Sequence, residues 1–116
     1  MINLVKVKEE TELNFPVENY ERGYKLVKDE QTIGFGTINK DRENAFYIFI
    51  NEEERGKGYG KILFSKILDE SKNIGCNNPK VTFEKENIPM TKITVDNGGT
   101  LIWSDGEKVK YEISLK

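Results

Sequence analysis

The segment 45–60 constrains this chain more than any other, because three structural signals follow one another in it without a break. Six apolar residues predict a strand over 45–50, and five mostly charged residues follow it. Gly56, Gly58 and Gly60 come next, on alternate positions, where an amphipathic stretch predicts a helix over 58–73. Glycines at such a turn let backbone N–H groups approach a ligand, and the first helical turn adds unpaired donors and a charge of about +0.5. The segment therefore predicts an anion site, best suited to a phosphate or diphosphate.

Composition excludes several classes of protein. The 116 residues fit one domain, 1–116, and a net charge of −2 with scattered lysines argues against a nucleic-acid-binding protein. No apolar run approaches the ~20 residues of a membrane span, and no secretory signal opens the sequence. The chain has no histidine and a single cysteine, Cys76. We therefore expect no metal site, no intrachain disulfide and a cytoplasmic protein.

Turn signals divide the sequence into seven strands and two helices. The strands are predicted over 1–8, 24–28, 32–39, 45–50, 80–84, 100–104 and 109–115. The second helix is predicted over 88–97, with Asn87 as its N-cap and Gly98 at its end, and Gly75 is placed to end the first. The early strands read as an antiparallel meander, whereas the strands flanking the long helix should be parallel, because a helical crossover joins them. The fold class is therefore α+β, a mostly antiparallel mixed sheet with one central parallel βαβ unit.

The strand over 45–50 differs from the others because both of its faces are apolar. We expect it at the centre of the sheet, covered on both sides. We therefore expect Tyr47, which lies on this strand, to be a core residue in the first place and a catalytic residue only as the alternative. Met90 and Trp103 are also expected only to pack.

Two motifs resemble those of the GNAT superfamily of acyl-CoA N-acyltransferases. The acetyl-CoA loop of that family has the pattern Arg/Gln-x-x-Gly-x-Gly/Ala, which the run 55–60 (Arg-Gly-Lys-Gly-Tyr-Gly) matches in full, about five residues after an apolar strand. Asn87, followed by Met90, Ile93 and the closing run 97–99 (Asn-Gly-Gly), resembles the asparagine-containing helix of the family. The resemblance covers residues 24–115, and the chain is identified by it as a small, single-domain member with a GNAT-like fold.

This resemblance implies an N-acetyltransferase with acetyl-CoA as co-substrate and an amine as acceptor, which attacks the thioester directly. The strand should splay from 80–84, so that its backbone pairs with the pantetheine amides while the loop holds the diphosphate. Asn87 would contact the pantetheine arm or the neighbouring backbone. The cofactor-binding residues implied are Ile48, Phe49, Ile50, Arg55, Gly56, Lys57, Gly58, Tyr59, Gly60, Lys61 and Asn87.

The sequence departs from the family pattern at the positions of the acid and the base. Members that use a general acid commonly carry tyrosine seven residues after the helix asparagine, where this chain has Thr94, and a carboxylate position five residues before it is Thr82. Glu84, on the same strand face as Thr82, is our candidate for the general base, with Tyr47 as the alternative. The segment between the first two strands is also short for the usual pair of helices. We therefore expect an acceptor site that is open, or one that a partner completes in a homodimer.

Other interpretations of the same residues remain open. A noncatalytic acyl-CoA-binding or interaction module is the second hypothesis, suggested by Thr94, Thr82 and the short N-terminal region. A dinucleotide site is the third, but no glycine lies three residues after Gly58 and one βαβ unit is too little for it. At single positions, the basic residues of the loop could merely offset the glutamates 52–54, and Asn87 could be only a helix cap.

Overall fold

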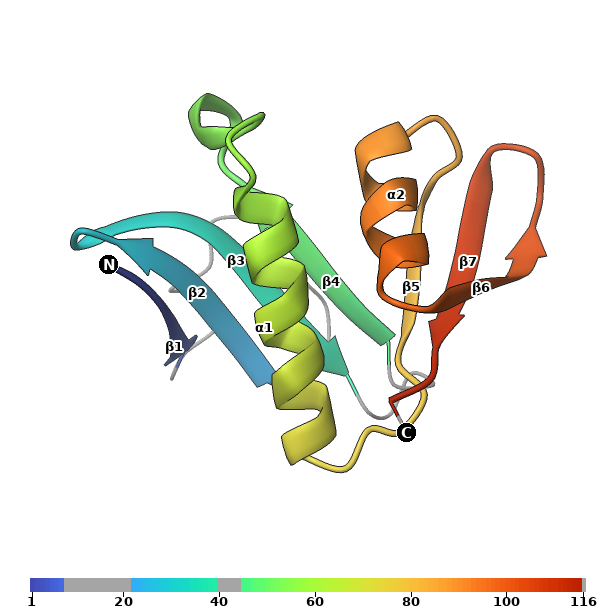
Figure 1. The fold of residues 1–116 in the computed structure, drawn as a ribbon, viewed down its shortest axis with the longest axis horizontal. Helices are drawn as coiled ribbons and strands as arrows, with labels where there is room; N and C mark the ends of the chain where they lie inside the picture. The colour runs from blue at the N-terminus through green and yellow to red at the C-terminus, as the bar shows by residue number, and fades with distance from the viewer. Residues whose placement is uncertain (8–21, 40–44, 116) are drawn as a thin grey trace.

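The computed structural model describes residues 1–7, 22–39 and 45–115, which form one mixed sheet with two α-helices on the same face (Figure 1). The strand order in the sheet is β1-β2-β3-β4-β5-β7-β6. The strands are β1 (Ile2–Val7), β2 (Arg22–Lys28), β3 (Gln31–Asn39), β4 (Ala45–Ile50), β5 (Lys80–Glu84), β6 (Gly99–Ser104) and β7 (Lys108–Ile113). The helices are α1 (Tyr59–Asn73) and α2 (Ile88–Asp96), and a short 3-10 helix, η2 (Glu52–Glu54), precedes α1. The predicted α+β class and element order are confirmed, while Lys8 lies outside the described residues.

Strands β1 to β4 form the predicted antiparallel meander, and β2 and β3 are joined by a two-residue turn. Lys28 pairs with Gln31, so only Asp29 and Glu30 form the loop. Both have positive φ, 49° and 70°, which is the type I′ turn that suits the twist of a hairpin. Position Glu30 is normally glycine in such a turn, because the left-handed conformation costs an L-residue about 1–2 kcal/mol.

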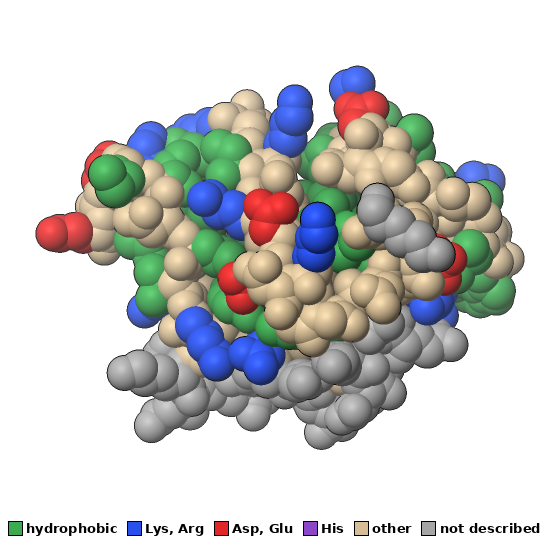
Figure 2. Space-filling model, turned by 60° about the horizontal axis from the view of Figure 1, so that its bottom comes forward, with side chains coloured by type: hydrophobic (Ala, Val, Ile, Leu, Met, Phe, Trp, Pro, Cys, Tyr) green, Lys and Arg blue, Asp and Glu red, His purple; other side chains and the backbone are tan. Residues whose placement is uncertain are grey.

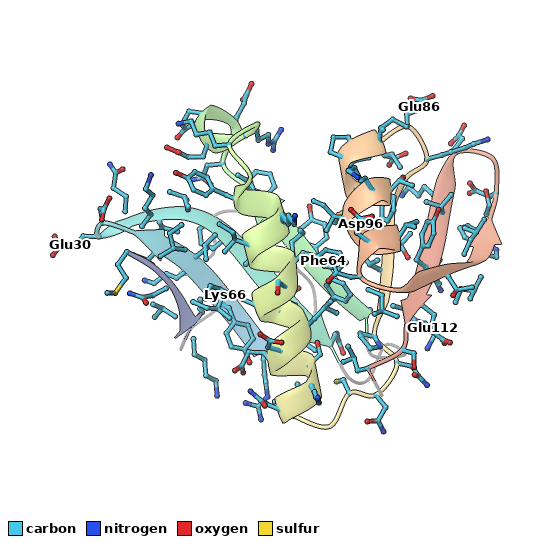
Figure 3. The ribbon with its side chains drawn as sticks, viewed as in Figure 1. Glu30, Phe64, Lys66, Glu86, Asp96 and Glu112 are labelled. Carbon is cyan, nitrogen blue, oxygen red and sulfur yellow. The ribbon has the colours of Figure 1, made fainter. Side chains whose placement is uncertain are left out.

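We expect Glu30→Gly to stabilise the protein by about 0.5–1 kcal/mol, because the relieved strain exceeds the entropy lost by a glycine. Glu30 points away from the body of the protein, so nothing else is removed (Figure 3). Chemical denaturation measures the change. Glu86→Gly is the matched control, since Glu86 is equally exposed and has no positive φ. It should lower stability, and equal effects at both positions would contradict the strain argument.

Helix α1 covers the middle of the sheet and supplies much of the core. Its buried residues are Tyr59, Leu63, Phe64, Ile67, Leu68 and Ser71. Phe64 points toward the sheet and meets Phe46 of β4 edge-on, with ring centroids 5.1 Å apart (Figure 3). The helix ends as predicted at Gly75, whose φ is 84°, and Cys76 N donates to Ser71 O to close a Schellman motif. Cys76 is buried and is not part of a disulfide.

Two polar contacts fasten β2 to α1. Tyr24 Oη donates to Glu70 Oε2 at 2.9 Å, and burial, with this contact to a carboxylate, raises the pKa of Tyr24 to about 12. Lys28 Nζ donates to Tyr59 Oη at the first residue of α1. This bond raises the pKa of Lys28, which therefore keeps its positive charge beside the start of the helix. The start of α1 is thus held from the sheet as well as by its own backbone.

The C-terminal part differs from expectation in its exposed residues. The predicted hairpin forms, but β7 is inserted between β5 and β6, which leaves β6 at the edge of the sheet. Trp103 on β6 is 47% exposed, so the expectation that it packs is wrong.

The central position of β4 is confirmed, but its cover on both faces is not. Tyr47 is 45% exposed, on the face opposite α1, where no described helix covers it.

Acidic and basic side chains are interspersed over the surface. On the face shown in Figure 2, Lys and Arg lie beside Asp and Glu and form no continuous basic patch. The described helices include none that is both long and apolar enough to cross a membrane. Within the same residues, no group of three or more Cys, Asp or Glu side chains is placed to hold a metal ion.

Candidate functional site

The parallel strands β4 and β5 diverge, and a cavity fills the space between them. Their register contains one pair, Ala45 and Lys80, and the strands separate from there toward Ile50 and Glu84 (Figure 1). The predicted splay is therefore present. The cavity has a volume of about 740 Å³. It is lined by Tyr47, Ile48, Phe49, Ile50, Glu54, Arg55, Gly56, Gly58, Tyr59, Gly60, Lys61, Val81, Thr82, Phe83, Glu84, Asn87, Pro89, Met90, Ile93 and Lys108.

The backbone of β4 alternates between its two neighbours. Asn51 N donates to Ile33 O at 2.9 Å, which makes Gly34 and Ile50 a non-hydrogen-bonded pair of the antiparallel ladder. The polar backbone groups of Ile48 and Ile50 therefore point toward β5, whereas those of Phe49 pair with Phe35 on β3. Since β5 has already diverged, the groups of Ile48 and Ile50 face the cavity. Phe49 lines the cavity without offering its backbone to it.

The glycine loop leaves a row of backbone donors unpaired at the open end of the cavity. Gly56 and Gly58 have φ of 79° and 87°, and a side chain at either would meet nothing within 4 Å. Among the described residues, Ile62 is the first in α1 to donate its backbone N–H, to Gly58 O at 3.4 Å. Within the part of the chain that the structure describes, the N–H groups of 56–61 have no protein acceptor, so they and the helix dipole make a cradle that would suit an anion.

The basic side chains of this loop fall into three different places. Lys57 Nζ pairs with Glu54 at 3.2 Å and does not line the cavity, which fits the interpretation that it offsets the glutamates. Arg55 folds back, donating from Nε to Ile50 O at 2.9 Å with its guanidinium 5.1 Å from the centre of the Phe49 ring. Lys61 is exposed and lines the cavity. The structure therefore brings Arg55 and Lys61 to the cradle and leaves Lys57 beside it.

Helix α2 forms the opposite wall. Asn87 caps it as predicted, because its Oδ1 accepts from Met90 N at 3.2 Å, and Asn87 also lines the cavity. Met90 and Ile93 line the cavity too, so Met90 does more than pack. Together with Pro89 they make this wall apolar. The spacing of Met90 and Ile93 on one helix face was the available signal, but it is equally the signal of a core face.

The candidate catalytic residues share the face of the sheet opposite α1 and α2, on which the described residues place no helix. Thr82 and Glu84 are exposed, on the side of β5 opposite to the buried Val81 and Phe83, and Tyr47 is exposed on β4 beside them. The carboxylates that line the cavity are those of Glu54 and Glu84, and Glu54 is paired with Lys57. Among the described residues, Glu84 is therefore the carboxylate of the cavity that is available for a proton.

Thr94 does not reach the cavity. Its side chain is fully buried, and its Oγ1 has no hydrogen-bond partner. A Cβ on Gly99 would come within 2.6 Å of Thr94 Cγ2, so residue 99 must be glycine for α2 to pack on β6. A threonine held in this way cannot donate a proton to a bound thiolate.

Comparison with known proteins identifies the family. The model of the acetyltransferase (GNAT) family matches residues 5–93. The chain belongs to the GNAT family. No curated protein matches its sequence significantly.

Solved structures share the whole fold at low sequence identity. The Campylobacter jejuni N-acetyltransferase PseH in complex with acetyl coenzyme A gives a TM-score of 0.76 at 17% identity, over 100% of both chains. A Bacillus subtilis acetyltransferase in complex with CoA gives 0.79 at 14%, again over 100% of both chains. The ribosomal-protein-S18-alanine N-acetyltransferase from Escherichia coli gives 0.77 at 13%, over 100% of this chain and 95% of that one. The mixed sheet with its diverging central strands is thus a GNAT fold.

Proposed function

We propose that this protein is an N-acetyltransferase that transfers the acetyl group of acetyl-CoA to an amine. The observation that carries the proposal is the cavity between β4 and β5, which opens directly onto the unpaired N–H groups of residues 56–61. A diphosphate suits those donors, and an amide-bearing arm suits the free backbone of a strand. Two of the structural neighbours, PseH and the Bacillus subtilis protein, hold acetyl-CoA or CoA, which supports the same ligand here.

The cofactor would lie along β4. Its diphosphate would rest on the glycine loop with Lys61 nearby, and its pantetheine amides would pair with the backbone of Ile48 and Ile50. Tyr59 would position the loop through Lys28, and Asn87 would border the arm from α2. Phe49 would contribute its side chain, on which Arg55 rests. The thioester would then lie beside Ile48, in the part of the splay that Glu84 borders.

The acceptor would attack from the face of the sheet opposite α1 and α2, where Tyr47, Thr82 and Glu84 are exposed. The amine must lose a proton, the thioester oxygen must be stabilised as its charge develops, and the thiolate must gain a proton. Glu84, on the open side of the cavity, would take the amine proton through water. The thiolate would be protonated from solvent, since Thr94 is enclosed. The products are an N-acetyl amine and CoA.

A noncatalytic acyl-CoA-binding module is the second candidate, and the burial of Thr94 is the observation that favours it. Its cavity would bind the same cofactor, so ligand binding alone does not separate the two. A cytoplasmic location also remains a prediction, for which the reduced, buried Cys76 is the support. The homodimer likewise remains a prediction.

We expect acetyl-CoA to raise the melting temperature, because a ligand bound only to the folded state stabilises it by about 2.7 kcal/mol at a hundredfold excess over Kd. Differential scanning fluorimetry with acetyl-CoA, CoA and NAD measures this, with NAD as the control that should have no effect. Thiol release in the presence of a panel of amines then distinguishes enzyme from binder. A melting curve unchanged by millimolar acetyl-CoA would contradict the proposed function.

A further inference from the structure

The open face of the sheet carries two pairs of opposite charges between β5 and β7, and the two pairs behave differently. Lys80 pairs in register with Glu112, and Glu84 with Lys108, on the same face of the same two strands. The Lys80 and Glu112 side chains form an ion pair at 3.5 Å. Glu84 and Lys108 form none within 4.0 Å, although residues paired directly in an antiparallel ladder are close enough to do so.

We call Glu84 and Lys108, which form no ion pair with each other, the unclosed pair. It is this pair that lies at the cavity. Glu84 and Lys108 both line it, whereas Lys80 and Glu112 do not. A positive and a negative side chain therefore lie on neighbouring strands beside the cavity, on the face left to the acceptor, and form no ion pair with each other.

Lys108 is held in place by the turn before it. Asp105 Oδ1 accepts the backbone N–H groups of Glu107 and Lys108 at 2.9 and 2.8 Å, and Glu107 O accepts from Lys85 N at 2.8 Å. These bonds lower the pKa of Asp105, which keeps its carboxylate charged and the turn formed. The ammonium of Lys108 is thus presented to the cavity from a fixed backbone.

From this unclosed pair we infer that the acceptor is an amino acid, whose amino group lies against Glu84 and whose carboxylate lies against Lys108. The inference rests on the proposed function and adds the chemical class of the substrate. An amino acid carries both charges a few bonds apart, so it can bridge two opposite charges that do not meet each other. The phosphates of the cofactor have their own donors across the cavity, in the loop 56–61 and Lys61.

The test compares free amino acids with their methyl esters, which keep the amine and lose the carboxylate charge. Because the ester also changes the basicity of the amine, the measured quantity is the acid-to-ester ratio of kcat/KM in each variant. Lys108→Met should lower this ratio about tenfold from its wild-type value, while the Kd of CoA stays unchanged. Lys110→Met is the matched control, since Lys110 lies two residues along β7 on the same face and does not line the cavity. It should keep the wild-type ratio.

Three results would overturn the inference. One is a ratio that Lys108→Met leaves unchanged, and a second is turnover of esters and simple amines with no preference for the acids. The third is a rise in the Kd of CoA in Lys108→Met, which would assign this lysine to the cofactor. Each of these leaves acetyl transfer itself standing. A wild-type protein that binds no CoA and releases no thiol with any amine would instead contradict the proposed function, and the inference with it.

Discussion

Gly60→Val is expected to weaken CoA binding about 100-fold or more while the protein stays folded. Gly60 is the second residue of α1, and a Cβ built there lies 3.8 Å from Ile93 Cδ1 and 3.9 Å from Ile50 Cγ1, which are ordinary contacts. A Cβ therefore fits the empty protein, and the methyl groups beyond it would occupy the cavity between β4 and α2. Each hydrogen bond lost to a charged diphosphate is worth about 1.5–3 kcal/mol, so one or two account for the expected change. Isothermal titration with CoA measures it.

Gly58→Val tests the same cradle, but the substitution changes stability as well as CoA binding. Gly58 has φ of 87°, which valine adopts only with strain, so this variant should lose both stability and binding. Gly106→Val is the matched control for the strain, because Gly106 has φ of 94°, open space around it and no place in the cavity. It should lose stability and keep the affinity for CoA. Normal CoA binding by Gly60→Val and Gly58→Val would show that the loop is only a turn.

The cofactor side of the site could be predicted from the sequence because it depends on local signals. Three alternating glycines between an apolar strand and an amphipathic helix leave few other structures, and Asn87 three residues before Met90 is a helix cap by spacing alone. The approximate bounds of the helices and strands could be predicted for the same reason. The splay itself followed from the family resemblance, since no residue of β4 or β5 specifies where two parallel strands part.

The parts that the sequence did not specify depend on contacts between distant segments. Lys108 was missed because its place in the cavity comes from the insertion of β7 beside β5, which brings it opposite Glu84. Tyr47 and Trp103 were expected in the interior because aromatic residues usually pack, and hydrophobicity does not show which face of a sheet lacks a helix. Phe49 was grouped with its neighbours because alternation along a strand becomes informative only when the register is known.

Glu84→Gln is expected to lower turnover about 10²–10⁴-fold with little effect on the affinity for CoA, as is typical when a general base is removed. With no histidine in the chain, the amine proton must go to a carboxylate, a tyrosine or water. Glu54 is paired with Lys57, so Glu84 is the carboxylate that remains among the described residues of the cavity. The loss should shrink as the pH rises, because more of the acceptor is then already the free amine. Steady-state kinetics from neutral to alkaline pH measure both effects.

Tyr47→Phe is the comparison that decides between the two candidates. Tyr47 lies on the same face of the sheet, but on β4, next in sequence to Ile48, beside which the thioester is proposed to lie. If Glu84 accepts the amine proton, Tyr47→Phe should change turnover severalfold at most and leave the pH dependence of the wild type. A large loss in Tyr47→Phe together with wild-type turnover in Glu84→Gln would transfer the role to the tyrosine. Wild-type turnover in both variants would leave the amine to lose its proton to water, with positioning by the cavity as the main source of rate.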